Sequence, residues 1–282
     1  MKKLLLSSII ILFLSSCASD SDPIAPSNTE KSLVKVIQMN YYQGSLEERI
    51  VFIYENNKPK IDSFYNADRD LTGYSKWSYN SNNLLSSIKG HLPNGTVNYE
   101  SSLIYDNDNR IIQEDTNEDN GTYISVIKFT HNNDNTISSV TTAGNFNSSK
   151  TFHINNDGLI YKETNADNTI TVSEVVYNGN NPVSKIAYNN TLTYTYDEVN
   201  MPKGIFLTLY KNLFGENKAN PVLWGNNLDD YVGSSADKFL IKEESNSYMN
   251  ENKYTFDTDG YPIRKETYYN NELGSELEYI YQ

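Results

Sequence analysis

One phrase recurs along the whole chain and limits the folds that are open to it. In SLIYDNDNRIIQED, residues 102–115, an apolar run ends at a tyrosine, a polar turn follows, and a second apolar pair comes next. Aligning the copies gives the anchor residues Tyr54, Tyr79, Tyr105, His131, Ile154, Tyr177, Tyr196, Phe256 and Tyr281. All but two of the steps between them are 23 to 26 residues, and a period of this size is typical of repeat architectures.

Two turn signals divide each repeat. One follows the anchor, as at Asp157-Gly158, and the other lies midway, as at Asn94-Gly95. Such pairs tolerate the positive φ that tight hairpin turns need. Because Tyr, Ile, Val and Thr fill the 10 to 13 residues between turns, each repeat is predicted to be one antiparallel hairpin. The predicted fold class is all-β, a meander of consecutive hairpins.

The faces of the predicted strands indicate the shape of the sheet. In TITVSEVVY, residues 169–177, both faces carry apolar and polar side chains, and the strand is apolar on both sides only near its anchor. The apolar pairs after the turns, such as Leu84-Leu85 and Leu159-Ile160, fit the same picture. We therefore expect a strongly twisted or curled sheet that covers itself near one edge and is more open at the other.

The N-terminus predicts export and a lipid anchor. Lys2 and Lys3 precede an apolar run that is shorter than the roughly 20 residues a spanning helix needs, as in a signal peptide. Leu14-Ser15-Ser16-Cys17 resembles the lipobox of bacterial lipoproteins, which implies lipidation of Cys17, the only cysteine, although an ordinary secretory signal is the alternative. The expected domains are a signal peptide at 1–16, a flexible tether at 17–31 and a hairpin-repeat domain at 32–282.

The run from Tyr54 to Tyr281 resembles the YD-type, RHS-like hairpin repeats of lipoproteins of unknown function from the Bacteroidota. Tyr105-Asp106 and Tyr196-Asp197 keep the literal Tyr-Asp pair, whereas His131 and Ile154 depart from it. The resemblance implies the fold and an outer-membrane location, with the protein facing the periplasm or the cell surface.

The repeat is interrupted once, at about residues 203–240. The segment IFLTLYKNLFG, residues 205–215, has helical spacing and predicts a short helix before a loop that contains Trp224. Such an insertion is either a hydrophobic cap on the sheet or a binding site. As the binding residues of the second interpretation we select Trp224, Tyr210, Phe214 and Tyr231.

Few residues suggest catalysis. The chain has three histidines and no G-x-S-x-G, H-E-x-x-H or glycine-rich phosphate loop, so we expect no catalytic residues, no metal and no cofactor. Adjacent carboxylates such as Asp229-Asp230 would point to opposite faces of a strand and are expected to be solvated. Without residues 1–16 the chain holds 21 basic and 36 acidic residues, and this charge argues against nucleic-acid binding.

The 23 tyrosines allow two interpretations. They pack the strands, or some of them form an exposed aromatic face that grips a glycan or a protein. Together these patterns predict a lipid-anchored, non-enzymatic binding or scaffolding protein of the cell envelope with a protein or glycan partner. The alternative is a carbohydrate-active hydrolase or glycan-binding protein with its site at the 203–240 insertion.

Overall fold

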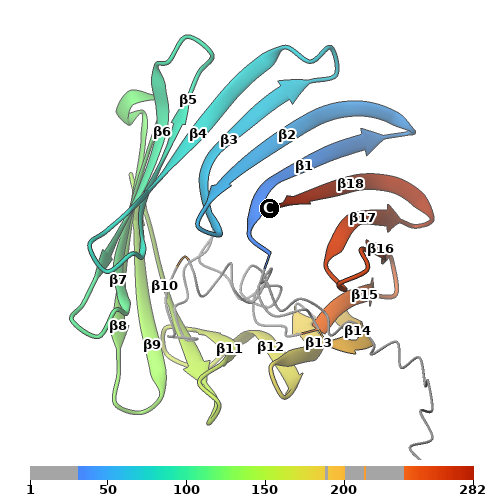
Figure 1. Ribbon diagram of the computed structural model, residues 1–282. Helices are drawn as coiled ribbons and strands as arrows, with labels where there is room; N and C mark the ends of the chain where they lie inside the picture. Colours follow the sequence, from blue (N-terminus) through green and yellow to red (C-terminus); the bar gives the residue numbers. More distant parts are fainter. Residues whose placement is uncertain (1–30, 188–189, 201–212, 214–237) are drawn as a thin grey trace, which may run out of the picture.

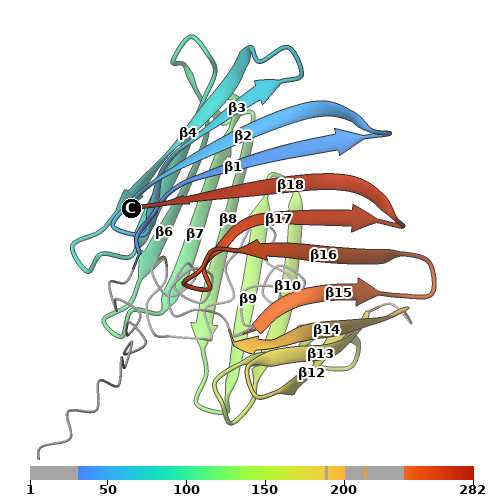
Figure 2. The ribbon, with the colours of Figure 1, turned by 45° about the vertical axis from the view of Figure 1, so that its right-hand side comes forward.

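The computed structural model describes residues 31–187, 190–200, 213 and 238–282 (Figures 1 and 2). It contains one antiparallel sheet of eighteen strands in which each strand pairs with its neighbours in sequence. The strands are β1 (Leu33–Tyr42), β2 (Ser45–Glu55), β3 (Lys58–Asn66), β4 (Leu71–Tyr79), β5 (Leu85–His91), β6 (Val97–Tyr105), β7 (Ile111–Glu118), β8 (Tyr123–His131), β9 (Thr136–Ala143), β10 (Phe146–Ile154), β11 (Ile160–Asn165), β12 (Thr171–Asn178), β13 (Asn181–Ala187), β14 (Asn190–Asn200), β15 (Lys238–Glu244), β16 (Met249–Phe256), β17 (Pro262–Tyr269) and β18 (Glu272–Tyr281). A short 3₁₀ helix, η1 (Asp119–Gly121), joins β7 to β8. Within these ranges no helix is long and apolar enough to cross a bilayer.

The first and last strands join, so the sheet closes into a barrel. Val36 of β1 faces Phe52 of β2 on one side and Tyr279 of β18 on the other. Ser32 and Gln282 exchange two backbone hydrogen bonds of 3.0 Å, and Figure 1 shows the resulting ring of strands. The all-β class and the hairpin meander are confirmed, but the expected open edge is wrong. Closure gives every strand two partners and removes both edges of the twisted sheet.

One face of the sheet forms the inside of the barrel all the way round. Residues opposite each other on paired strands share a face, and following the pairs from β1 leads through Val36, Phe52, Asp62, Ser75, Gly90 and Tyr99. The largest cluster of buried apolar residues lies on this face or at its turns: Leu85, Ile88, Ile111, Phe129, Ile137, Phe152, Leu159, Ile160, Val175 and Leu213. Leu213, from the predicted insertion, is therefore part of the core, as a cap would require.

The outer face is rich in charge. Lys89 on β5 pairs with Glu100 on β6 at 2.9 Å, and Arg264 on β17 pairs with Glu276 on β18 at 2.7 Å. These residues lie in the middle of their strands and alternate with residues of the inner face. Exposed apolar side chains such as Ile104, Val176 and Ile280 lie on this face as well. The outer wall therefore carries both ion pairs and apolar side chains.

The recurring anchors are held by one repeated hydrogen bond. The hydroxyl of an anchor tyrosine donates to a backbone carbonyl near the start of a preceding strand: Tyr79 to Pro59 (2.6 Å), Tyr105 to Leu85 (2.7 Å), Tyr177 to Ile160 (2.9 Å) and Tyr281 to Pro262 (2.7 Å). His131 makes the equivalent bond to the Ile111 carbonyl through Nε2, at 2.9 Å. Histidine therefore departs from the repeat in sequence but keeps its bond.

The residue after the anchor explains the second half of the motif. Oδ1 of Asp106 accepts hydrogen bonds from the backbone N–H groups two and four residues later, and Asn80, Asn155 and Asp257 do the same. This side chain closes the polar turn by bonding to its backbone. Positive φ at Asn83, Asn109, Gly158 and Gly260 confirms the turns that the sequence predicts.

Candidate functional site

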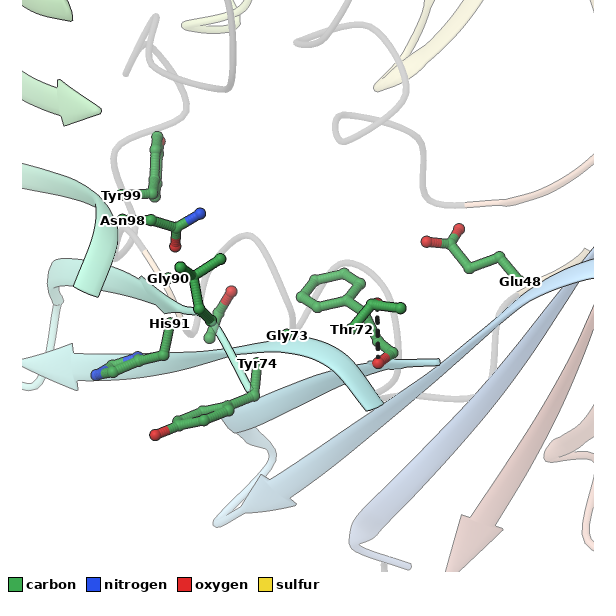
Figure 3. A pocket seen from close by; sticks show the side chains of 11 residues that line it. Glu48, Thr72, Gly73, Tyr74, Gly90, His91, Asn98 and Tyr99 are labelled. Carbon is green, nitrogen blue, oxygen red and sulfur yellow. Dashed lines mark hydrogen bonds between the residues drawn. The ribbon is translucent and has the colours of Figure 1, made fainter. Parts of the chain in front are cut away.

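A cavity of about 330 Å³ lies over β4 and β5 (Figure 3). Its size is within the range of small-ligand pockets. Strands β2 to β6 contribute to it, and the residues that line it are Glu48, Phe64, Thr72, Gly73, Tyr74, Ser75, Gly90, His91, Leu92, Asn98 and Tyr99. It is therefore built from five successive strands rather than from one loop.

Two glycines make the floor of this cavity. Gly73 faces Phe64 of β3, and Gly90 faces Tyr99 of β6 as well as Ser75 of β4. A Cβ atom at Gly73 would lie 2.9 Å from the His91 carbonyl oxygen, and one at Gly90 would lie 3.0 Å from Cβ of Tyr99. Any larger residue would crowd these neighbours, so the floor is bare backbone.

Aromatic residues stand beside this floor on both sides. Phe64 precedes it on β3 and Tyr99 follows it on β6, so the order across the sheet is aromatic, glycine, glycine, aromatic. Burial raises the pKa of the Tyr99 hydroxyl, which therefore stays protonated near neutral pH. The result is a slot with two aromatic walls.

The opposite side of the floor is braced by a second aromatic pair. The rings of Tyr74 and His91 stack with their centroids 4.6 Å apart and an interplanar angle of 4°. His91 Nδ1 lies 3.0 Å from the Lys89 carbonyl oxygen. Figure 3 shows both rings pointing away from the side on which Glu48 and Tyr99 lie. The stack is a side-chain contact between β4 and β5. Gly73 and Gly90 cannot supply such a contact on the inner face.

One carboxylate reaches the cavity, and it is held in place. Glu48 Oε2 accepts a 2.8 Å hydrogen bond from Asn40 Nδ2, and Asn40 Oδ1 accepts one of 2.8 Å from Gln38 Nε2. Within the described part of the chain, Oε1 of Glu48 has no hydrogen-bond partner. The relay through β1 and β2 thus orients Glu48 and leaves one of its oxygens for a ligand.

This arrangement is suited to binding a ring with an apolar face and a polar rim. The glycine floor and the aromatic walls accept the face, while Glu48, Asn98 and Ser75 offer hydrogen bonds at the rim. Glu48 is the single carboxylate among the described residues that line the cavity. Among the described residues, no group of three or more His, Cys, Asp or Glu side chains is arranged to hold a metal ion.

The binding residues selected from sequence stay a prediction. Trp224, Tyr210, Phe214 and Tyr231, like Cys17, lie outside the described residues, and β15 begins at Lys238, inside the range predicted for the insertion. His131 lies opposite Ile137 of β9, and His153 lies opposite Thr136 of the same strand. Because Ile137 and Thr136 are adjacent, the two histidines lie on opposite faces of the sheet and form no pair.

Sequence reasoning missed the glycine floor. Most glycines of the described chain have positive φ in turns, whereas Gly73 and Gly90 lie inside strands. A glycine within a strand marks a bulge or a close approach of another group. This signal was present in TGYS and IKGH, but it did not show that the two positions would be neighbours.

Comparison with known proteins identifies no family. No protein-family model matches the chain, and no curated protein matches it. A porin-like protein from Bacteroides uniformis shares 10% identity with a TM-score of 0.31, over 89% of this chain and 98% of that chain. A structure of TcdB2-TccC3 shares 10% identity with a TM-score of 0.31, over 82% of this chain and 13% of that chain. Scores this low do not establish a shared fold, so the function is argued from the site.

Proposed function

We propose that this chain is a lipid-anchored, non-enzymatic protein of the bacterial outer membrane that binds a glycan inside its barrel. The observation that carries the proposal is the slot over Gly73 and Gly90. A pyranose ring has C–H groups on its faces and hydroxyls at its rim, and the slot offers aromatic walls, a bare floor and a fixed carboxylate acceptor.

The charge of the protein limits the class of ligand further. The chain carries a formal charge of −13, and the one ionic group of the slot is Glu48. Both features disfavour an anionic ligand at this position. We therefore propose a neutral sugar ring as the group that occupies the slot.

Binding fits the slot better than hydrolysis does. Glycoside hydrolases use two carboxyl groups about 5 to 9 Å apart, one as acid and one as base or nucleophile. Among the described residues of the lining, Glu48 has no second carboxylate beside it. The slot therefore supports recognition of a glycan and offers no acid–base pair for its cleavage.

The outer wall supports anchoring by lipid. A lipid-facing strand surface would carry an apolar band, and a charge at the bilayer midplane costs about 2 to 4 kcal/mol. The pairs Lys89–Glu100 and Arg264–Glu276 occupy mid-strand positions of this wall. A lipid on Cys17 would hold the barrel at the membrane while this wall stays in water.

Glycan binding is tested with variants of the slot. Tyr99→Ala and Glu48→Gln are each expected to weaken binding of a neutral oligosaccharide at least tenfold, because they remove a wall and the charged acceptor. Isothermal titration against a panel of neutral envelope and plant oligosaccharides measures this. Ile104→Ala is the matched control, since Ile104 lies on the same strand as Tyr99 but is exposed on the outer face.

Two results would contradict this proposal. The first is that no neutral oligosaccharide of the panel binds the unaltered protein. The second is that a bound oligosaccharide has the same affinity for all three variants, in which case it binds elsewhere.

Anchoring is tested separately at Cys17. Cys17→Ser is expected to move the protein from the membrane pellet to the soluble fraction and to abolish labelling by a palmitate analogue, because the acceptor for the lipid is lost. Fractionation and labelling of cells that express each form measure this. A Cys17→Ser protein that stays in the pellet would show that something other than a lipid on Cys17 holds it there.

A further inference from the structure

A second part of the barrel interior has the opposite electrostatic character from the slot. Lys265 lies on the inner face of β17, between Tyr254 of β16 and Leu277 of β18. Its Nζ lies 5.9 Å from the centroid of the Tyr254 ring. In the described part of the chain it has no hydrogen-bond or ion-pair partner, although an ammonium group has three donors to satisfy.

The carboxylates of this region face the other way. On the central stretches of β16, β17 and β18, Glu251, Glu266, Glu276 and Glu278 alternate with the inner residues and lie on the outer face. Two of these, Glu266 and Glu276, pair there with Arg264 at 2.9 and 2.7 Å. Although the chain has a large excess of acidic residues, none of these four glutamates lies on the inner wall around Lys265.

Neutral polar side chains lie on the same wall as Lys265. Thr267 donates a 2.8 Å hydrogen bond to Asn252 Oδ1, and Asn252 Nδ2 donates one of 2.9 Å to the Leu240 carbonyl oxygen. Ser275, opposite Thr267 and diagonal to Lys265, is 8% exposed, and its hydroxyl has no partner among the described residues. Lys265 and Ser275 thus offer donors that no described group on this wall uses.

We propose that Lys265 and Ser275 form a binding subsite for an oxyanion, a carboxylate or a phosphate, inside the barrel. Burying part of an unpaired ammonium group costs free energy unless a hydrogen-bond acceptor satisfies its donors. An oxyanion supplies both the negative charge and the acceptor oxygens. This subsite does not depend on the glycan slot, which lies on β2 to β6. It would add recognition of an acidic group to a ligand that enters the barrel.

The protonation of Lys265 supports this assignment. Burial lowers the pKa of Lys265 below its ordinary value. The other titratable groups on the inner faces of the two neighbouring strands are Tyr254 and Tyr279, whose pKa values burial raises, so both stay neutral at physiological pH. Because only the charged amine attracts an anion, binding is expected to weaken as pH rises through the lowered pKa of Lys265.

Nuclear magnetic resonance of methylated lysines tests the proposal. The lysine amines of the full chain are reductively methylated with ¹³C, which keeps their charge, and Lys265→Met and Lys253→Met assign two resonances. Lys253 is the matched control because its Nζ lies 4.2 Å from the Tyr268 ring centroid, a similar cation–π contact on the outer face. Inorganic phosphate and acetate are titrated separately at constant ionic strength.

The expected result is a saturable shift of the Lys265 resonance at a half-saturation concentration at least tenfold below that of Lys253. A preference for phosphate or for acetate then identifies the anion class. Ser275→Ala is expected to weaken the effect severalfold without moving the Lys253 resonance. Parallel, non-saturating shifts of both lysines would overturn the proposal. Since the comparison is made within the unaltered protein, a variant that fails to fold does not obscure the outcome.

Discussion

Tyr105→Ala is expected to lower the free energy of unfolding by about 3 kcal/mol, the range of buried aromatic truncations. Tyr105 packs against the main core cluster, and its hydroxyl donates a 2.7 Å hydrogen bond to the Leu85 carbonyl oxygen. The substitution removes both contacts and leaves a cavity between two successive hairpins. Tyr177→Ala, which loses the equivalent bond to the Ile160 carbonyl oxygen, is expected to have a similar effect.

Two controls separate packing from hydrogen bonding and from general effects of losing a tyrosine. Tyr105→Phe keeps the ring and is expected to cost only about 1 kcal/mol, the net value of one hydrogen bond. Tyr42→Ala is expected to change stability little, because Tyr42 is 61% exposed. Urea unfolding followed by circular dichroism measures all four variants. If the two anchor variants unfold like the parent, the recurring tyrosines do not hold the hairpins together.

Asp62→Asn is expected to raise the free energy of unfolding relative to the parent, and to do so more at neutral pH than at acid pH. Asp62 is 5% exposed on the inner face, where Trp77 Nε1 donates a 2.7 Å hydrogen bond to Oδ2. Its other oxygen, Oδ1, is buried without a partner. Burial raises the pKa of Asp62 to about 6, and the bond from Trp77 only partly opposes this.

The sign follows from the direction of this shift. Because the pKa is higher in the folded protein than in the unfolded chain, the folded protein binds the proton more tightly, and stability is lost as pH rises from about 4 to about 6. A rise from 3.8 to about 6 corresponds to about 3 kcal/mol. Asparagine cannot ionise, so it removes this loss and keeps an acceptor for Trp77.

Unfolding experiments at pH 4 and pH 7.5 measure this effect. The difference in stability between Asp62→Asn and the parent is expected to be about 2 kcal/mol more favourable to the variant at the higher pH, because the parent has already lost part of the total by pH 4. Other ionisable groups titrate equally in both proteins and cancel. As a second measurement, Trp77 fluorescence in a Trp224→Phe background should change with a midpoint near pH 6. A stability difference that is the same at both pH values would show that Asp62 is not buried as a charge.

The local structure of this protein could be predicted from sequence. Tyrosine followed by Asp or Asn, then a polar turn, specifies a strand end, an anchor and a turn whose backbone the side chain of Asp106 closes. These are interactions between residues close in sequence or one repeat apart. The same holds for the apolar pairs: Leu84, Leu85, Leu159 and Ile160 are all buried, as predicted.

Closure of the sheet and the slot over Gly73 and Gly90 were decided by the tertiary structure. Whether β18 reaches β1 depends on twist and stagger accumulated over eighteen strands, to which each hairpin adds a small amount that its sequence does not display. The slot depends on pairing register. A shift of one residue between β4 and β5 would move Gly90 to the other face, away from Gly73.

The same distinction explains the orientation of the charges. The sequence alone showed that acids outnumber bases, but the register decided that Glu48 and Lys265 lie on the inner face while Glu266 and Glu276 lie on the outer face. Composition fixes how much charge a chain carries. Only the paired strands, which alternate their side chains between two faces, decide where in the molecule that charge acts.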